Sequence, residues 1–505
     1  MKVVNSVRDL KDVKDKNEQE HVVILGAGPA GLATGHEICE HGVKVTVLER
    51  NDFVGGLCNT NDHNGYKFDL GGHRWFTKNE DLNNWFRRLM GEEVVWVERI
   101  SRIYYDGGYY TYPISILNVI KNAGLPTIMY AGITYLLSAL QYSIFNKSIN
   151  NMKDAYTAQF GHKLYDMFFR RYSEKVWGLP CEKLSADWVS QRSAGLSIWT
   201  VIQESLLKTK SDNESLIEEF MYPRDGYVRI PQRMAEDIVD ASEGNKIHLE
   251  STVTGINYRG PNDFEIIYTD TAGNKSSTEA TSVVSTIPLG VLPRILNPGA
   301  PQEVIDAAKS LSFRDLITVN IVLNKERVSI DTWLYVQDED ILFGRLHEPK
   351  NWSKAMVPDQ STTSLVLECF CTRGDHIWNM TDEEVGKRCA EDLEHKLGFI
   401  KADEVIDFQC VRSLQAYPVY DLDYGDNIKI INDFLAGFEG LHIVGRGGTH
   451  RYNNADHSIE MGLLLGRKIL GYDVDYMDVN TEPEYHEIKT SKDLKRDHYK
   501  VEEEA

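Results

Sequence analysis

Residues 21–50 read HVVILGAGPAGLATGHEICEHGVKVTVLER. The apolar run His21–Leu25 has the composition of a buried strand and leads directly into Gly26-Ala-Gly28-Pro-Ala-Gly31. A helical stretch follows, and Val43–Leu48 predicts a second strand that ends at Glu49. Strand, glycine-rich turn, helix, strand and terminal acid together form the dinucleotide-binding pattern. The sequence therefore predicts an α/β fold that opens with a Rossmann-type unit.

Each position of this pattern has a physical reason. Gly26 permits the tight turn, Gly28 lets the backbone approach a pyrophosphate, and Gly31 lets helix and strand pack closely, with Ala30 in the same loop. The free N–H groups of the helix N-terminus attract phosphate. Glu49 stands where an acid accepts hydrogen bonds from ribose hydroxyls. The pattern alone does not separate NAD from FAD.

Length and charge narrow the classes of function. The chain has 505 residues, of which 42% are apolar, enough for two or three domains with a large core. Its formal net charge is −21, which argues against nucleic acid as a partner, because phosphate backbones are bound by clustered Lys and Arg. A small anionic ligand is not excluded, since a local pair of arginines can dominate a buried site.

The seven cysteines are scattered without the spacing of metal ligands, and Cys369 and Cys371 alternate as in a strand. We expect free thiols, a reducing cytoplasmic location and no metal site. Residues 1–20 are charged, without an apolar signal segment, and are expected to form a flexible tail.

The segment Gly124–Phe145 carries no formal charge and approaches the length of a membrane span. Its proline, serines, threonines and tyrosines favour a buried or subunit-interface helix, so a homo-oligomer is expected. A helix on a membrane surface is a less favoured alternative, and a true span is least favoured.

Two further motifs indicate which dinucleotide is bound. Arg50-Asn-Asp-Phe-Val-Gly55-Gly56-Leu57 continues directly from the second strand. It resembles the second flavin motif of the large FAD family that includes amine oxidases, protoporphyrinogen oxidase and the UDP-galactopyranose mutases. Near the other end of the chain, Leu441–Arg446 has the pattern of a strand that ends in Gly445-Arg446. A helix is expected to follow, with Asp456 or Ser458 as its N-cap.

This resemblance implies FAD as the cofactor. It places the Arg446 side chain near the FAD diphosphate and the N-terminus of the last helix at the pyrimidine end of the flavin, where a positive helix end favours anionic reduced flavin. The cofactor-binding residues that it implies are Gly26, Gly28, Ala30, Gly31, Glu49, Arg50, Gly56, Leu57, Gly72, His73, Val253, Gly445, Arg446, Asp456 and Ser458.

Four other segments resemble the UDP-galactopyranose mutases, especially the longer eukaryotic type. They are Phe68–His73 with its Gly-Gly-His loop, Phe169–Pro180 with Arg170, Tyr172, Lys175 and Trp177, a predicted hairpin with Tyr335 and Arg345, and two tyrosine segments with Tyr417 and Tyr452. In that family the histidine lies near flavin N5, and the arginines and tyrosines reach the diphosphate of the substrate. The resemblance covers residues 22–471.

The resemblance implies a redox-neutral interconversion of the pyranose and furanose forms of a nucleotide sugar by reduced FAD, with NAD(P)H as reductant and the sugar held on flavin N5. His73, Arg170 and Arg345 are then the catalytic residues, and the implied substrate-binding residues are Tyr112, Tyr156, Trp177, Tyr335, Tyr417 and Tyr452. The alternatives are a FAD-dependent oxidase or dehydrogenase of the protoporphyrinogen or amine oxidase type, and a non-catalytic flavoprotein.

The nucleotide-reading region departs from the family. Ser115 stands where the eukaryotic mutases have Gln, and Ala155 where they have a stacking Trp, with Tyr156 adjacent. A lost stacking surface is worth about 1–3 kcal/mol. The base and the sugar therefore stay open.

We expect three regions besides the tails. A discontinuous FAD-binding domain comprises 20–100, 220–310 and 430–472; a helical substrate or interface region comprises 112–220; and a sheet-rich substrate domain comprises 311–429. Any lid is expected at 208–218, and 473–505 forms a C-terminal tail.

Overall fold

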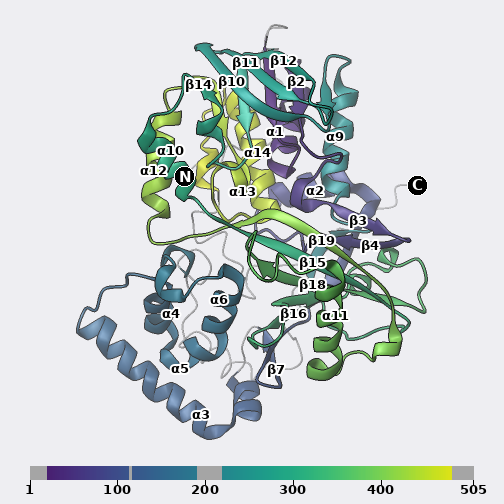
Figure 1. The fold of residues 1–505 in the computed structure, drawn as a ribbon, viewed down its shortest axis with the longest axis vertical. Helices are drawn as coiled ribbons and strands as arrows, with labels where there is room; N and C mark the ends of the chain where they lie inside the picture. Colours follow the sequence, from purple (N-terminus) through teal and green to yellow (C-terminus); the bar gives the residue numbers. More distant parts are fainter. Residues whose placement is uncertain (1–19, 113–115, 190–218, 480–505) are drawn as a thin grey trace, which may run out of the picture.

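The computed structural model describes residues 20–112, 116–189 and 219–479 (Figure 1). The expected lid at 208–218, most of the two expected tails, and Ser115 lie outside the described residues. Among the described residues, the first part of the expected C-terminal tail is packed against the body. Tyr476 and Val479 are buried there, and Arg451 Nη1 donates to the carbonyl of Met477 at 2.6 Å.

A five-stranded parallel sheet forms the Rossmann-type core. Its order is β20-β13-β1-β2-β9, with bounds Leu441–Ile443, Ser282–Ser285, His21–Leu25, Lys44–Leu48 and Lys246–His248. Val22 and Ile24 pack against helices α1 (Pro29–Cys39), α9 (Arg229–Ala241) and α14 (Ala455–Ile469). Val23 and Leu25 pack on the opposite face. Because both faces are covered, β1 is apolar throughout, and the predicted fold class is confirmed.

The second face is covered by two helices and a sheet that is antiparallel except for the parallel pair β10–β14. The sheet order is β12-β11-β10-β14, with bounds Lys275–Ala280, Asp263–Thr269, Thr252–Gly260 and Leu296–Asn297. Helices α10 (Gln302–Ser310) and α12 (Tyr424–Leu435) complete this cluster. In Figure 1 these elements lie at the top and upper left around the parallel sheet.

Helix α14 returns the C-terminal part of the chain to the N-terminal motif. A Cβ atom on Gly462 would lie 2.3 Å from the carbonyl oxygen of Ala30, and one on Gly466 would lie 2.7 Å from Glu37 Cβ. The two helices therefore touch backbone to backbone, which only glycine permits at these positions.

A seven-stranded sheet lies below this core in Figure 1. Its order is β19-β15-β18-β17-β16-β6-β7, with bounds Val405–Pro418, Phe313–Leu323, Thr363–Cys371, Arg345–His347, Trp333–Val336, Ser101–Tyr105 and Gly108–Tyr112. Helix α11 (Asp382–Asp392) packs on one face. The predicted hairpin exists as β16 and β17, in which Tyr335 faces Arg345. Strands β6 and β7 add residues 101–112 to this sheet, a segment that the predicted regions left largely unassigned.

Smaller elements connect these sheets. Strands β3 (Thr60–His63) and β4 (Tyr66–Asp69) form a hairpin, and β5 (Val94–Glu98) pairs with β8 (Glu219–Pro223). Helix α2 (Glu80–Met90) lies between β4 and β5 in the sequence. Its N-cap Asn79 accepts hydrogen bonds from two backbone amides.

The helical region contains α3 (Ile116–Ala139), α4 (Met152–Phe160), α5 (His162–Tyr165) and α6 (Arg171–Trp177). Gly124, with φ of 80°, kinks α3 two residues before Pro126. Of the two expected settings, burial within the chain is wrong: the most apolar window of this segment is only 17% buried, because α3 lies at the outer edge of the region. A subunit-interface helix stays a prediction. Among the described residues it is the one helix long and apolar enough to cross a membrane.

Candidate active site

The glycine-rich turn has the shape of a phosphate-binding loop. Gly26 has φ of 104°, a value that side-chain-bearing residues rarely adopt. A Cβ on Gly31 would lie 2.4 Å from the Gly26 carbonyl oxygen, so this glycine serves close packing. A Cβ on Gly28, in contrast, would meet no atom within 4 Å, which leaves space beside the N-terminus of α1. Backbone N–H groups and open space at a helix N-terminus fit a pyrophosphate.

The second glycine motif meets the first one. The amide of Gly55 donates to the carbonyl of Ala27 at 2.8 Å, and a Cβ on Gly56 would lie 3.6 Å from Gly28 Cα. Leu57 packs toward the aromatic cluster of the helical region. The two motifs thus border one space beside Gly28, as the cofactor assignment requires.

Glu49 ends β2 and is buried. Its Oε2 accepts from the amide of Ala27 at 2.8 Å, and its Oε1 accepts from the amide of Asn51 at 2.9 Å. These bonds fix the carboxylate at the edge of the loop, where the prediction places the ribose. Val253 lies at the start of β10, and Arg50 is exposed.

Arg446 and the start of α14 border the same space. Arg446 donates through Nε and Nη2 to the carbonyl of Asn453 at 2.8 and 2.6 Å, and its guanidinium lies 4.9 Å from the centre of the Tyr452 ring. The N-cap of α14 is Asn454, so the prediction of Asp456 or Ser458 is wrong. They lie two and four residues beyond the N-cap and are buried, because the helix begins earlier than expected.

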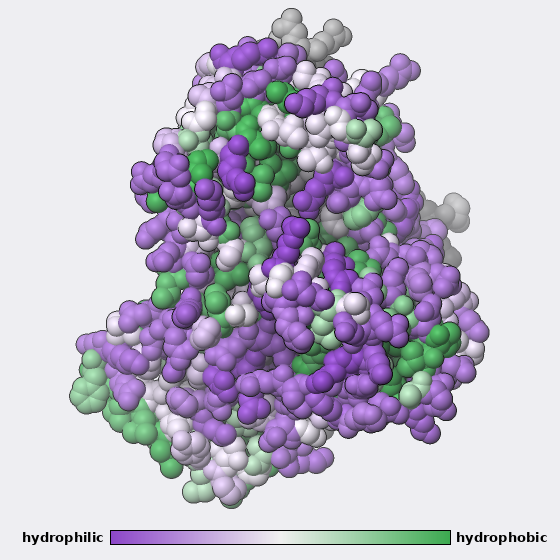
Figure 2. Space-filling model, viewed as in Figure 1, coloured by the Kyte–Doolittle hydropathy of each residue, from purple (hydrophilic) through white to green (hydrophobic). Residues whose placement is uncertain are grey.

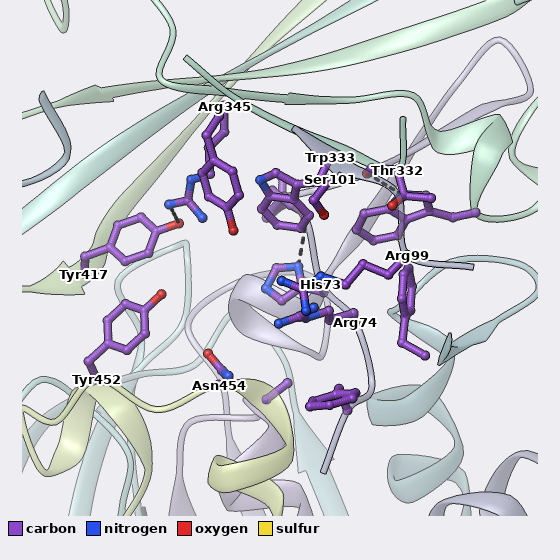
Figure 3. A pocket seen from close by; sticks show the side chains of 18 of the residues that line it. His73, Arg74, Arg99, Ser101, Thr332, Trp333, Arg345, Tyr417, Tyr452 and Asn454 are labelled. Carbon is purple, nitrogen blue, oxygen red and sulfur yellow. Dashed lines mark hydrogen bonds between the residues drawn. The ribbon is translucent and has the colours of Figure 1, made fainter. Parts of the chain in front are cut away.

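A pocket opens between the Gly71–Arg74 loop, the seven-stranded sheet and the start of α14 (Figure 3). His73 lies in the middle of the view, with Arg345 and Trp333 on the sheet side and Asn454 on the α14 side. The polar and aromatic residues that line it include Gly72, His73, Arg74, Arg99, Ser101, Thr332, Trp333, Tyr335, Arg345, Tyr417, Arg446, Tyr452 and Asn454. The structure therefore brings together six of the predicted catalytic, substrate-binding and cofactor-binding side chains: His73, Tyr335, Arg345, Tyr417, Arg446 and Tyr452.

Arg345 is held by two buried partners. Its Nη2 donates to the hydroxyl of Tyr417 at 3.1 Å, and its Nε lies 3.3 Å from Oε2 of Glu368, whose side chain is 1% exposed. Burial opposes the charge of Arg345, but the Glu368 carboxylate and three neighbouring tyrosine hydroxyls together outweigh burial and raise the pKa of Arg345. Arg345 is therefore a fixed cation at the wall of the pocket.

Glu368 also fixes the loop that carries the histidine. Its Oε1 accepts from the amide of Gly72 at 3.2 Å, and Tyr417 donates to its Oε2 at 3.4 Å. One carboxylate thus links the cation, the phenol and the Gly-Gly-His loop. Glu368 was not predicted, although it is the one charged residue in the apolar run Thr363–Cys371, and a lone buried carboxylate requires a partner.

His73 is neutral at physiological pH. Burial, and then the positive charges of Arg446 and Arg345, lower its pKa to about 4. Its Nδ1 lies 3.1 Å from the carbonyl oxygen of Gly71, an acceptor, so Nδ1 carries the proton. The other ring nitrogen, Nε2, then has a lone pair available to the pocket.

Lys175 holds the hairpin that carries Tyr335 and Arg345. Its Nζ donates to the carbonyls of Val336, Asp338, Ile341 and Phe343 at 3.4, 2.6, 3.0 and 3.3 Å. This lysine of the Phe169–Pro180 motif therefore joins the helical region to the turn between β16 and β17.

Other predicted residues do not line this pocket, although Trp177 packs edge to face on Tyr417 and Tyr452, which do, at 6.4 and 6.3 Å. Arg170 Nε donates to Asp166 at 2.6 Å, and its Nη1 donates to Glu174 at 3.1 Å, on the surface of the helical region. Tyr156 is buried and stacks on Phe169 at 4.4 Å, and Trp177 packs edge to face with Trp188 at 4.7 Å. Tyr112 does not line the pocket but lies 5.5 Å from Tyr335. A direct role for Arg170 would require the helical region to move on ligand binding.

The pocket side of the sheet also holds an unsatisfied donor. The buried Nε1 of Trp333 has no hydrogen-bond acceptor among the described residues. A Cβ on Gly72 would lie 2.1 Å from Trp333 Cζ3, so the indole lies directly on the Gly-Gly-His loop. A free buried donor beside an open glycine loop fits a ligand with oxygen acceptors.

The chain belongs to the family described as flavin containing amine oxidoreductase, whose profile matches residues 29–424. It is therefore a FAD-dependent enzyme of the amine oxidase superfamily, and the Gly28 space, Glu49 and the second glycine pair fit that cofactor.

Several known proteins are similar to it. A phytoene desaturase of Phycomyces blakesleeanus is 50% identical over 52 residues, which is 10% of this chain and 9% of the desaturase. A probable UDP-galactopyranose mutase of Klebsiella pneumoniae is 25% identical over 173 residues, which is 33% of this chain and 44% of that protein. These matches thus span less than half of each relative.

Solved structures agree over nearly the whole fold. Reduced UDP-galactopyranose mutase has a TM-score of 0.75 at 21% identity, covering 91% of this chain and 96% of its own. A putative protoporphyrinogen oxidase of Exiguobacterium sp. 255-15 has a TM-score of 0.69 at 17% identity, covering 90% and 99%. The resemblance to the mutases is confirmed at the level of the fold, and the oxidase shares that fold.

Proposed function

We propose that the chain is a FAD-dependent mutase that interconverts the pyranose and furanose forms of a nucleotide sugar, without net oxidation. The observation that carries this proposal is the composition of the pocket. Arg345 faces it together with the hydroxyl-bearing Tyr335, Tyr417 and Tyr452 beside His73. Guanidinium and phenol donors suit the oxygens of a diphosphate, whereas an oxidase of apolar substrates has no need of this set.

The leaving group gives Arg345 its role. When the bond between sugar and diphosphate breaks, negative charge grows on the diphosphate oxygens. A cation that is already fixed by Glu368 and Tyr417 stabilises that charge without reorganising.

His73 and the glycine loop would lie at the reactive ring of the cofactor. A neutral imidazole with its proton on Nδ1 offers Nε2 as an acceptor, and it adds no positive charge of its own. FAD held by Gly28, Glu49 and Gly56 would, when reduced by a nicotinamide donor, supply the nucleophilic ring that reacts at the anomeric carbon of the sugar.

The base must be recognised by residues other than Tyr156, because that ring is stacked inside the helical region. Arg74 and Arg99 line the pocket and are further cations that a nucleotide could contact. UDP-galactopyranose is the first substrate to test.

The test uses the FAD-loaded protein, reduced with dithionite and kept without oxygen. UDP-galactopyranose or UDP-galactofuranose is added, and the products are separated by chromatography. We expect interconversion that requires reduced flavin and leaves it reduced. Arg345→Ala should lower turnover by about 100-fold. The matched control Arg259→Ala removes an exposed, ion-paired arginine of β10 and should have no effect.

The oxidase is the outcome that would replace this proposal. If nucleotide sugars neither react nor change flavin fluorescence, while the oxidised protein consumes oxygen with an amine or a porphyrinogen, the mutase assignment is wrong. If UDP binds but neither galactose form reacts, the diphosphate site stands and another sugar must be sought.

A further inference from the structure

Helix α3 buries Val119 near its start, but from Ala131 onward it packs on the protein with small and polar residues. Ala131, Thr134 and Ser138 are buried at 4–8% exposure, and Thr134 Oγ1 accepts from the amide of Lys163 at 3.3 Å. A Cβ on Gly161 would lie 2.6 Å from Tyr135 Cα, so α3 lies directly on the start of α5. A surface helix of a water-soluble domain normally shows the opposite arrangement, with its aliphatic side inward.

The aliphatic side of α3 faces outward. These side chains are 43–77% exposed, and they continue past the helix into the following turn. They are Leu125, Met129, Ile133, Leu136, Leu137, Leu140, Ile144 and Phe145, with Ile149 beyond them at 50%. Figure 2 shows them as a continuous green strip along the lower left edge of the molecule, where Figure 1 places α3. Contiguous exposed apolar surface of this kind marks an interaction site.

The charges around this strip favour a negatively charged partner. No Asp or Glu occurs from residue 107 to residue 153, although the chain as a whole has a net charge of −21. The stretch contains Lys121, Lys147 and Lys153, of which Lys147 and Lys153 form surface ion pairs with Asp154 and Glu182. Anionic lipid headgroups attract such lysines and would be repelled by most of the remaining surface.

The packing excludes a spanning helix. One side of α3 lies against α4, α5 and β7, so lipid cannot surround it. A two-fold contact between copies through this face would bring the lysines of both copies close together, whereas anionic lipid headgroups neutralise them. We propose that α3 and the turn to Ile149 dock this protein on an anionic membrane surface, with the helix parallel to the bilayer and its aliphatic side inserted.

The test is co-sedimentation of the full, FAD-loaded chain with vesicles of phosphatidylcholine alone or mixed equally with phosphatidylglycerol. We expect binding to the mixed vesicles. The variant Met129→Ser/Ile133→Ser/Leu136→Ser/Leu140→Ser should bind at least about 100-fold more weakly. Its flavin content and Tm should match wild type, since these side chains are exposed.

A matched control removes four exposed aliphatic side chains elsewhere, as Val239→Ser/Ile330→Ser/Ile406→Ser/Leu422→Ser, and should bind as wild type does. Equal binding by the α3 variant and wild type would overturn the proposal, as would a wild type that ignores mixed vesicles at low salt. A wild-type dimer that becomes a monomer in the α3 variant, without vesicle binding, would identify a subunit interface instead.

Discussion

Replacing Glu368 with Gln tests how the pocket keeps its cation. The amide has nearly the same shape, and its oxygen can still accept from Gly72 N, as Glu368 Oε1 does at 3.2 Å. What the variant removes is the negative charge 3.3 Å from Nε of Arg345. The change therefore isolates the ion pair from the loop contact.

The expected cost follows from burial. Breaking a buried ion pair costs about 3–5 kcal/mol, because it leaves a desolvated charge without its partner. Arg345 is 12% exposed toward the pocket, so we expect the lower end, about 3 kcal/mol. An unfolding entropy near 2.1 cal/mol/K per residue gives about 1 kcal/mol/K for 505 residues, and hence a fall in Tm of about 3 °C.

An anionic ligand should reverse this loss. UDP would partner the uncompensated Arg345, so UDP should raise the Tm of the variant more than that of wild type. The assay is thermal unfolding of the FAD-loaded proteins with and without saturating UDP. Arg345→Met/Glu368→Leu, which removes both charges, should be insensitive to UDP.

The reasoning fails if Glu368→Gln melts as wild type does and gains no more from UDP. Arg345 would then be held by Tyr417 and by solvent in the pocket. A large fall in Tm that UDP does not repair would mean that Glu368 chiefly supports the Gly-Gly-His loop.

Three further predictions concern the contact between α14 and α1, the protonation of His73, and the hairpin held by Lys175. Gly462→Val should overpack α14 on Ala30 and lower the free energy of unfolding by at least about 1–3 kcal/mol. It should also lower the ratio of flavin to protein absorbance after gel filtration. The control Gly425→Ala, at an open helical position, should change neither quantity. The pKa of His73 is about 4 in the folded protein and near 6.5 in the unfolded chain. As pH falls from 6.5 to 4, the Tm of wild type should therefore fall more than that of His73→Gln. An equal dependence of Tm on pH in the two proteins would contradict a neutral His73. Lys175→Met should leave four carbonyls without their donor and lower both Tm and turnover. Lys163→Met, at a half-buried position of α5 away from the hairpin, should change neither.

The Rossmann-type unit could be predicted because the residues that define it are close together in the sequence. The turn at Gly26, the close contact at Gly31 and the acid at Glu49 each follow from a backbone need within one βαβ unit, and the structure has them as expected. The β16–β17 hairpin also follows from its own turn. In it Tyr335 stands opposite Arg345.

The contacts in the wall of the pocket could not be predicted, because they depend on pairings between strands that are far apart in the sequence. Glu368 becomes a partner of Arg345 only because β18 pairs with β17, and it reaches Gly72 across nearly 300 residues of sequence. The placement of Tyr156 inside an aromatic cluster was equally hidden, because a tyrosine beside the expected stacking position is compatible with either core or site. Hydropathy in α3 could not tell which face would be buried, because its small polar residues proved to be the contact surface.

The order of strands in the parallel sheet has a consequence for how this protein folds during its synthesis. Strands β1 and β2 are synthesised before the rest of the sheet. Strand β13, which pairs with β1, follows more than 230 residues later, and β20, which pairs with β13, more than 390 residues later. Helix α14 closes on α1 only after residue 469 has appeared. Such distant contacts make folding slow and leave early strands exposed. The nascent chain must therefore keep the apolar β1 from other partners for most of its synthesis, and chaperones that bind extended apolar segments should favour its first fifty residues.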